Sequence, residues 1–358
     1  MKRIKNIIAM ATLAIVAVSC NTSQPVTRSS AEKLLDLINA GIEKGVVMLG
    51  HQDDPVYGHS WKYEANRSDV LEVVGDYPAV MGWEIGGIEL GDAESLDGVP
   101  FNLIRDEIIS QHKRGGINTV SWHTFNPFGG DSWDEGPGVV TSILKGGEHY
   151  DMFQAQLSIV ADFFSTLKTD DGEAVPIIFR PWHEHDGSWF WWGDKWCTHA
   201  EYIELWDMTH DFMAARGLDN LVWCYMPMNG GDDKTPSVDK FDMLGIDEYQ
   251  SKGNTEKYMQ DMGSKIELLK KYSAKYDKPI TISETGSEGL PSENWFTEVL
   301  LPSLEGAPVS YVLLWRNAWD KQEHFYCSYK GHSSEADFRK FVANPAIITA
   351  RQVADIQK

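Results

Sequence analysis

Two kinds of hydrophobic pattern alternate along the chain: short continuous apolar runs, and longer segments in which apolar residues recur with the period of a helix. Eight short apolar runs, rich in β-branched residues, recur between residues 45 and 319, and each closes in polar or glycine-rich sequence. Runs bounded in this way are typical of buried parallel strands. The eight predicted strands lie in GVVMLGHQDD (45–54), YPAVMGWEIGG (77–87), GINTVSWHTFNP (116–127), AVPIIFRPWHEHDG (174–187), NLVWCYMPMNGG (220–231), FDMLGIDEYQ (241–250), KPITISETGSEG (278–289) and VSYVLLWRNAW (309–319).

Most of the segments between these runs have the period of an amphipathic helix. The segment 29–45 predicts a helix that begins with a capping box. The segments 200–217 and 255–277 are also helical in pattern, whereas 227–240 leaves room for one turn of helix at most. The clearest apolar stripe lies in the segment 151–168. The residues that carry these predictions are Ser29 and Glu32 for the capping box, Phe153, Leu157, Val160, Phe164 and Leu167 for the stripe, and Gly217 as the stop of the helix predicted in 200–217.

The alternation of strands and helices predicts the fold class. Parallel strands need a crossover connection, which is usually a helix, and eight such units match a closed barrel. The length of the segment, about 330 residues, suits this architecture. No linker, low-complexity tract or change in composition divides the chain. We therefore predict an α/β fold, a (β/α)8 or TIM barrel, as a single domain over residues 29–358.

The N-terminal residues have the pattern of an export signal. A basic start precedes an apolar run from Ile7 to Val18, which is too short to span a membrane. The following AVSC resembles the lipobox of bacterial lipoproteins. We expect a lipoprotein signal peptide at 1–19, lipidation of Cys20, and a polar tether at 20–28. The expected location is the cell envelope, on the periplasmic side of the outer membrane rather than the cell surface. An ordinary signal peptide is the alternative.

The charge of the chain restricts its partners. Without residues 1–19, 29 basic residues face 53 acidic ones, a net charge of −24 at neutral pH. Such a surface repels nucleic acids and anionic lipids, so we expect membrane contact only through the lipid anchor. We also expect a monomer. Cys197, Cys224 and Cys327 allow one disulfide in an oxidising compartment, and their spacing does not select the pair.

The candidate chemistry lies at the ends of the predicted strands, where the active sites of such barrels form. This ring of strand ends contains carboxylates, imidazoles and aromatic rings. It lacks a phosphate-binding glycine loop, a GxSxG elbow and a HExxH helix. Its members are His51, Asp53, Trp83, Glu84, Trp122, His123, His183, Glu184, Tyr225, Asn229, Asp247, Tyr249, Glu284, Trp315 and Arg316.

Paired carboxylates beside aromatic side chains suit the hydrolysis of glycosidic bonds. One protonated acid must face the leaving oxygen, and one ionised carboxylate must lie below the anomeric carbon. Sugar faces stack on indole rings, and sugar hydroxyls bind His, Arg and Asn side chains. Glu184 follows the fourth strand and Glu284 the seventh, from opposite parts of the rim. We expect the tryptophans around Glu184 to form the walls of a sugar-binding cleft.

Four motifs resemble those of glycoside hydrolase family 26, whose best-known members are β-mannanases. They are RPWHEHDGSWFWWG, DMLGIDEY, ITISETG and LLWRNAW, in this order near the strand ends, and the resemblance extends over roughly residues 30–350. It implies a retaining glycosidase with Glu184 as the acid/base and Glu284 as the nucleophile. His183 occupies the position where most of the clan carries asparagine and family 26 carries histidine.

The resemblance also implies the substrate contacts. Tyr249 is expected to hydrogen-bond the nucleophile, and Trp315 to form the floor of the −1 sugar site. Trp189 is expected to stack on the leaving-group side. His123 and Arg316 are expected to reach the more distal glycone sugar.

These observations predict a retaining β-mannanase acting on mannan, galactomannan or glucomannan, either a mannan endo-1,4-β-mannosidase or a mannobiose-releasing variant. The alternatives are a family-related β-glucanase or β-1,3-xylanase and, from another class, a non-catalytic glycan-binding lipoprotein. The loops 88–100 and 126–150 are expected to wall one end of the cleft, which favours short products.

Some residues of the strand ends have a structural alternative. Trp191, Trp192 and Trp196 are equally consistent with sugar platforms and with packing inside their loop. Trp83, Glu84 and His51 are consistent with packing in the barrel. His183, His185 and Asp186 imitate a metal site, but adjacent loop residues rarely converge on one ion, so no metal or cofactor is expected.

Overall fold

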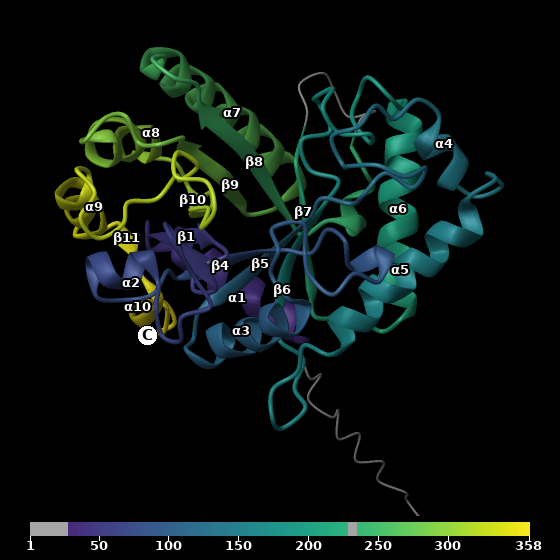
Figure 1. Ribbon diagram of the computed structural model, residues 1–358, viewed down its shortest axis with the longest axis horizontal. Helices are drawn as coiled ribbons and strands as arrows, with labels where there is room; N and C mark the ends of the chain where they lie inside the picture. Colours follow the sequence, from purple (N-terminus) through teal and green to yellow (C-terminus); the bar gives the residue numbers. More distant parts are fainter. Residues whose placement is uncertain (1–27, 228–234) are drawn as a thin grey trace, which may run out of the picture.

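A closed barrel of parallel strands forms the centre of the protein. The computed structural model describes residues 28–227 and 235–358, so the predictions for residues 1–19, for Cys20 and for Asn229 fall outside the described residues. Eight strands pair in the order β1, β4, β5, β6, β7, β8, β9 and β10. β10 also pairs with β1, from Tyr311 opposite Met48 to Leu314 opposite His51, which closes the ring (Figure 1). The predicted (β/α)8 barrel is confirmed.

Each of the eight apolar runs contains one barrel strand. The strands are β1 (Val47–Gln52), β4 (Val80–Glu84), β5 (Ile117–Trp122), β6 (Ile177–Pro181), β7 (Leu221–Tyr225), β8 (Met243–Gln250), β9 (Ile280–Ser287) and β10 (Val309–Leu314).

Most of the longer helices lie around this barrel (Figure 1). The capping box of Ser29 and Glu32 is present at the start of α1. The predicted stripe from Phe153 to Leu167 is buried along its length. Gly217 has a φ of 74° just after α6, as expected of a helix stop. The helices are α1 (Ser30–Glu43), α3 (Phe101–Lys113), α5 (Tyr150–Ser165), α6 (His199–Ala215), α7 (Thr255–Tyr276) and α9 (Glu335–Val342).

Several short elements were not predicted from the sequence. The hairpin of β2 (Tyr57–Gly58) and β3 (Trp61–Lys62) follows β1, and β11 (Ile347–Ile348) pairs with the start of β1. The fifth unit contains, among its described residues, the single turn η3 (Val238–Lys240), in agreement with its predicted shortness. The remaining short helices are α2 (Asp69–Val74), η1 (Ile88–Leu90), α4 (Val139–Ile143), η4 (Phe296–Leu300), α8 (Leu301–Leu304) and α10 (Ala350–Val353).

The barrel interior and the helix-facing surface of the strands form separate apolar clusters. Met48 belongs to the inner cluster and Leu49 to the outer one, because successive side chains of a strand point to opposite faces. Leu34 and Ile38 of α1 join the inner cluster. α1 therefore covers the N-terminal end of the barrel, and the C-terminal strand ends remain for the polar site.

Two further findings concern the described residues. No helix within 28–227 or 235–358 is long and apolar enough to cross a membrane. Cys197, Cys224 and Cys327 are free and buried, so the disulfide that the sequence allowed is not formed among them.

Candidate active site

The chain leaves β6 in a strained turn that carries Glu184. Trp182 and Glu184 have positive φ angles of 55° and 50°. Left-handed backbone costs about 1–3 kcal/mol at a non-glycine residue and persists only where its surroundings hold it. The buried Trp182 donates from Nε1 to Thr209 Oγ1 at 3.1 Å, and Trp192 Nε1 donates to His183 O at 2.8 Å. These contacts fix the backbone that presents the Glu184 carboxyl group.

The tryptophans of this loop divide into core and cleft residues. Trp191 and Trp192 are fully buried, and Trp196 is half-buried. The indole nitrogens of all three donate to backbone carbonyls. Trp189, by contrast, is 46% exposed. The expectation that the tryptophans around Glu184 jointly wall the cleft is therefore wrong for Trp191 and Trp192, because the loop closes on them as its own core.

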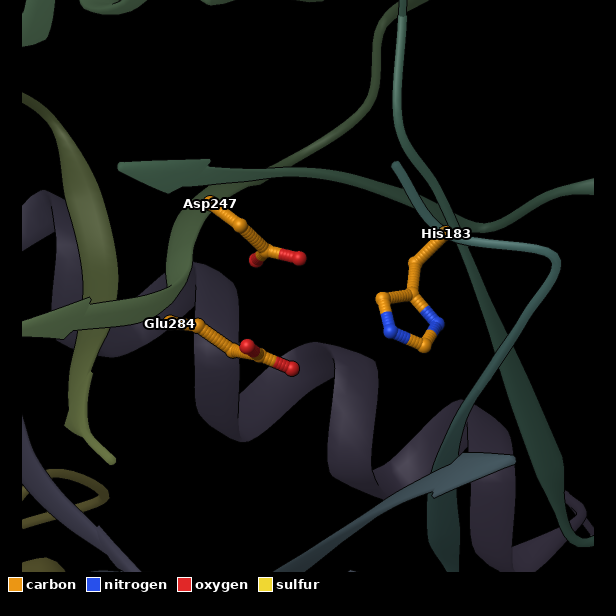
Figure 2. Close-up of side chains that lie close together, drawn as sticks. All are labelled: His183, Asp247 and Glu284. Carbon is orange, nitrogen blue, oxygen red and sulfur yellow. The ribbon is translucent and has the colours of Figure 1, made fainter. Parts of the chain in front are cut away.

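Glu284, in β9, lies among buried polar partners. Tyr249 Oη donates to Glu284 Oε2 at 2.8 Å, which is the contact that the family resemblance implied. Arg180 Nη2 donates to Glu284 Oε1, and Arg180 Nη1 lies 3.2 Å from Asp247 Oδ2. Asp247 and Glu284 extend from paired strands toward the ring of His183 (Figure 2). One buried guanidinium therefore bridges two buried carboxylates.

Glu184 has fewer polar contacts than Glu284. Trp189 Nε1 donates to Glu184 Oε2 at 2.6 Å. Both residues line a cavity of about 440 Å³, which Asp247 and Tyr249 line as well. Burial, followed by the negative charges of Asp247 and Glu284, raises the pKa of Glu184 to about 8. Glu184 therefore retains its proton at neutral pH, as a general acid must.

The surroundings of Glu284 also raise its pKa, but less than those of Glu184 do. Burial and the charge of Asp247 raise the pKa of Glu284 to about 7, while Arg180 and His123 oppose the rise. Two carboxyl groups that interact this closely titrate as a pair. When the pair holds one proton, Glu184 carries it, because its pKa is the higher. Glu284 is then ionised, and the two carboxyl groups are suited to different roles.

A histidine pair lies beside these carboxyl groups. His123 Nδ1 is 2.5 Å from Glu84 Oε2, and His123 Nε2 is 3.1 Å from His183 Nε2. Although burial lowers the pKa of His123, the adjacent Glu84 raises it to about 9. Burial and the charge of His123 lower the pKa of His183 well below its ordinary value. A charged His123 therefore donates to a neutral His183, and Glu84 is its counter-ion rather than a packing residue only.

A second cavity, of about 400 Å³, is lined by His123, Trp315 and Arg316. Arg316 Nη2 lies 3.2 Å from Oδ1 of the buried Asp97. Trp133 is 48% exposed, and its ring stacks on that of His123 with centroids 5.2 Å apart. This cavity therefore combines indole faces with charged hydrogen-bonding groups, the pair of features that sugars require.

The predicted site residues lie in or between these two cavities. Glu184, Trp189 and Tyr249 line the first cavity, and His123, Trp315 and Arg316 line the second. Glu284 contacts Tyr249, and His183 contacts His123, so these two residues connect the cavities. The loops 88–100 and 126–150 contribute Asp97 and Trp133 to the second cavity, where the sequence predicted a wall.

The comparisons with known proteins agree with this geometry. The sequence model of glycosyl hydrolase family 26 matches residues 22–289. The chain belongs to glycosyl hydrolase family 26. A mannan endo-1,4-beta-mannosidase of Bifidobacterium adolescentis is 30% identical over 370 residues, which cover 94% of this chain. A mannan endo-1,4-beta-mannosidase of Bacillus subtilis is 30% identical over 212 residues, which cover 54% of this chain. The chain spans only 36% and 56% of the lengths of these relatives.

Two solved structures of mannanases resemble most of this chain. A family 26 beta-mannanase of Bacteroides ovatus superimposes with a TM-score of 0.87 and 41% identity, over 90% of this chain and 96% of that one. A double mutant of the endo-beta-1,4-mannanase of Cellulomonas fimi has a TM-score of 0.81 and 28% identity, over 92% of this chain and 77% of that one.

Sequence reasoning missed several polar residues of this family 26 site. The sequence pattern does not single out Arg180, and it places Asp247 at a strand end without a role. A signal was present, because each interrupts an apolar run with a charge, and a buried charge needs a partner. Asp97 and Trp133 lie in long loops, where no local periodicity distinguishes a cleft residue from a surface residue.

One group of the family 26 site approaches the geometry of a metal centre. Ligand atoms of His183, Asp247 and Glu284 lie within 4.8 Å of one another (Figure 2). Arg180 contacts both carboxylates, so a divalent cation there would meet a buried positive charge. The donor set therefore fits a positioned carboxylate pair better than a metal ion.

The histidine pattern next to Glu184 has a structural explanation. The His185 ring stacks on Tyr202 with centroids 3.9 Å apart, and His185 Nε2 lies 2.9 Å from Met226 O. Asp186 is exposed. These residues do not converge with His183.

Proposed function

We propose that this family 26 chain is a retaining β-mannanase, which hydrolyses β-1,4-mannosidic bonds in mannan, galactomannan or glucomannan. The observation that carries the proposal is the pair of Glu184 and Glu284, whose surroundings raise their pKa values to different extents within one cleft. Relatives and structural neighbours named as mannanases support the choice of substrate.

In the first step, the ionised Glu284 attacks the anomeric carbon of the sugar bound before the scissile bond. Arg180 and Tyr249 hold the Glu284 carboxylate in one orientation. Glu184 gives its proton to the glycosidic oxygen as the bond to the leaving sugar breaks. The products of this step are a free leaving sugar and a glycosyl ester on Glu284.

In the second step, water replaces the leaving sugar. Glu184, now ionised, takes a proton from this water, and the resulting hydroxide attacks the anomeric carbon. The bond to Glu284 breaks and returns its electron pair to the carboxylate. Two inversions leave the configuration of the sugar unchanged, and Glu184 is again protonated.

The second cavity supports short products. Arg316 follows β10, and Asp97 lies in the loop after β4, so their ion pair joins two rim segments at the glycone end. Lys321 and His324 line the same cavity. A wall at this end favours short products such as mannobiose over products of internal cleavage.

The proposed substrate can be tested by comparing initial rates on three polymers. We expect β-mannan to be degraded about 100-fold faster than lichenan or β-1,3-xylan. A site built to bind the axial 2-hydroxyl of mannose leaves polar groups unpaired when the substrate is a glucan. The release of reducing ends by the purified protein measures all three rates.

The same experiment separates the alternatives. A higher rate on lichenan or on β-1,3-xylan would replace the mannanase proposal by a family-related β-glucanase or xylanase. Binding of mannan without the release of reducing ends would favour a glycan-capture lipoprotein. A protein that only binds glycans needs neither a protonated nor an ionised carboxyl group in its cleft. The presence of both, in Glu184 and Glu284, argues against such a binding role.

We also propose that the protein is a lipoprotein of the cell envelope, anchored through Cys20 on the periplasmic side of the outer membrane. The support is the sequence alone, namely the lipobox-like AVSC and the polar segment behind it. One acyl chain binds a membrane only marginally, so stable anchoring requires more than one.

Replacement of Cys20 tests this anchor. In cells, Cys20→Ala is expected to remove the label from radioactive palmitate and to move the protein out of the membrane fraction. The activity of the released barrel should be unchanged. Ser23→Ala, in the same tether, is the matched control and should remain labelled. If the wild-type protein is not labelled, the anchor is contradicted and the N-terminus is an ordinary signal peptide.

A further inference from the structure

One charged side chain of the first cavity, Lys265, has no role in the mechanism above. The cavity of about 440 Å³ that contains Glu184 and Trp189 is also lined by Asp186, Glu248 and Lys265. Among the described residues that line it, Lys265 is the one cation. It comes from the middle of α7, which packs along β8, and not from a strand end.

Lys265 interrupts the buried stripe of α7. Tyr258, Met262, Ile266 and Leu269 recur every three or four residues and are buried. Lys265 follows Met262 by three residues and precedes Leu269 by four, so it lies on the face that packs toward the barrel. Even a half-buried ammonium group costs free energy of desolvation, which an apolar side chain would avoid. Packing of α7 alone does not explain a lysine at this position.

The ammonium group of Lys265 is fixed to the strand beside the site. Nζ donates to Asp247 O at 2.7 Å and lies 2.7 Å from Glu248 Oε2. Both acceptors belong to β8, which also carries Tyr249. The position of Nζ is therefore fixed relative to Tyr249, the hydrogen-bond partner of Glu284. An ammonium group has three N–H donors, and this side chain remains 35% exposed. One donor is therefore left for the cavity.

We propose that Lys265 is a specificity-determining residue, which donates a hydrogen bond to a hydroxyl of the neutral sugar in the leaving-group position. Asp186 and Glu248 offer acceptors in the same cavity, and the exposed Trp189 offers a ring face. A sugar hydroxyl both donates and accepts, so a cation beside carboxylates satisfies both capacities. This inference rests on the proposed mannanase function and adds how a saccharide leaving group is selected.

A purely structural role of Lys265 makes a different prediction. An ion pair that only fastens α7 to β8 would change the turnover of every substrate alike. A hydrogen bond to the leaving sugar acts only when the leaving group is a sugar. The ratio of kcat/KM for mannotetraose to kcat/KM for an aryl β-mannobioside therefore distinguishes the two roles.

The test measures this ratio in Lys265→Met, which keeps the apolar stem and removes the ammonium group. We expect the ratio to fall about 10- to 100-fold, the loss of one hydrogen bond from a charged donor. Lys265→Arg, which keeps a charged donor, should recover part of the ratio. Lys257→Met is the matched control, because Lys257 belongs to the same helix, is 63% exposed and pairs with Asp261. Its ratio should equal that of the wild type.

Each outcome of the test decides the inference. An unchanged ratio in Lys265→Met, with both rates equal to those of the wild type or lowered together, overturns it. If Lys265→Met does not fold, Lys265→Leu, which also lacks a donor, is measured in its place, and an unchanged ratio there overturns the inference as well. A wild-type protein that cleaves neither mannotetraose nor the aryl glycoside contradicts the proposed function itself, and this inference with it.

Discussion

Glu284→Ala and Glu184→Ala are expected to lose activity in different ways. Without Glu284 no glycosyl ester can form, so hydrolysis of polymers and of reactive aryl glycosides should fall by on the order of 10⁴-fold or more. Without Glu184 a sugar leaving group lacks its proton, and mannan cleavage should fall about 10²- to 10⁴-fold. A dinitrophenyl β-mannobioside needs no proton, so Glu184→Ala should still release a burst of phenolate, followed by slow turnover.

Azide and the stereochemistry of the product give the decisive measurements. Azide needs no general base, so it should accelerate the turnover of Glu184→Ala and yield a mannobiosyl azide of β configuration. Glu267→Ala is the matched control, because Glu267 is exposed on α7 and pairs with Lys270. α-Mannose as the first-formed product of the wild type, observed by proton NMR, would contradict the double displacement.

Arg180→Met is expected to damage both stability and activity. Arg180 is 3% exposed and contacts the carboxylates of Asp247 and Glu284, so its removal leaves two buried charges uncompensated. Loss of one partner of a buried ion pair costs about 3–5 kcal/mol of unfolding free energy. Unfolding in urea measures this loss.

The pH profile of Arg180→Met gives a second readout. The Arg180 charge opposes the rise of the Glu284 pKa, so its removal raises that pKa further. Glu284 must be ionised to attack, and the acid limb of kcat/KM should therefore move to higher pH. At a fixed pH on that limb, a rise of one in the pKa lowers kcat/KM about tenfold. Arg114→Met, which removes a half-buried ion pair to Glu107 on the outer surface, should leave the profile unchanged. If the acid limb of Arg180→Met stays at the pH of the wild type, Arg180 does not lower the pKa of Glu284 and the prediction is wrong.

The secondary structure was predictable because its signal is local. The apolar stripe that begins at Phe153 identifies the buried face of α5, and Ser29 with Glu32 identifies the start of α1. Each strand is a short apolar run that ends in a turn. Local patterns of this kind also locate Glu184, three residues after the end of β6, and Glu284, within β9.

The polar network between the strands was not predictable in the same way. Arg180 meets Asp247 across 67 residues and Glu284 across 104. Which charges meet depends on the order and register of the strands around the barrel, and no local pattern encodes these. Trp189 and Trp192 show the same limit inside one loop. Trp192 bonds back to the carbonyl of His183 and is buried, whereas Trp189 is left on the surface.

The position of α1 has a consequence for the orientation that a lipid-anchored barrel would have relative to the membrane. α1 covers the N-terminal end of the barrel, and the described chain begins at Arg28, two residues before α1. The eight Cα–Cα steps from Cys20 to Arg28 reach at most about 29 Å, whereas a compact domain of this length is on the order of 50 Å across. An acyl group on Cys20 would therefore hold the barrel base toward the bilayer, with its mouth turned outward to approaching glycans.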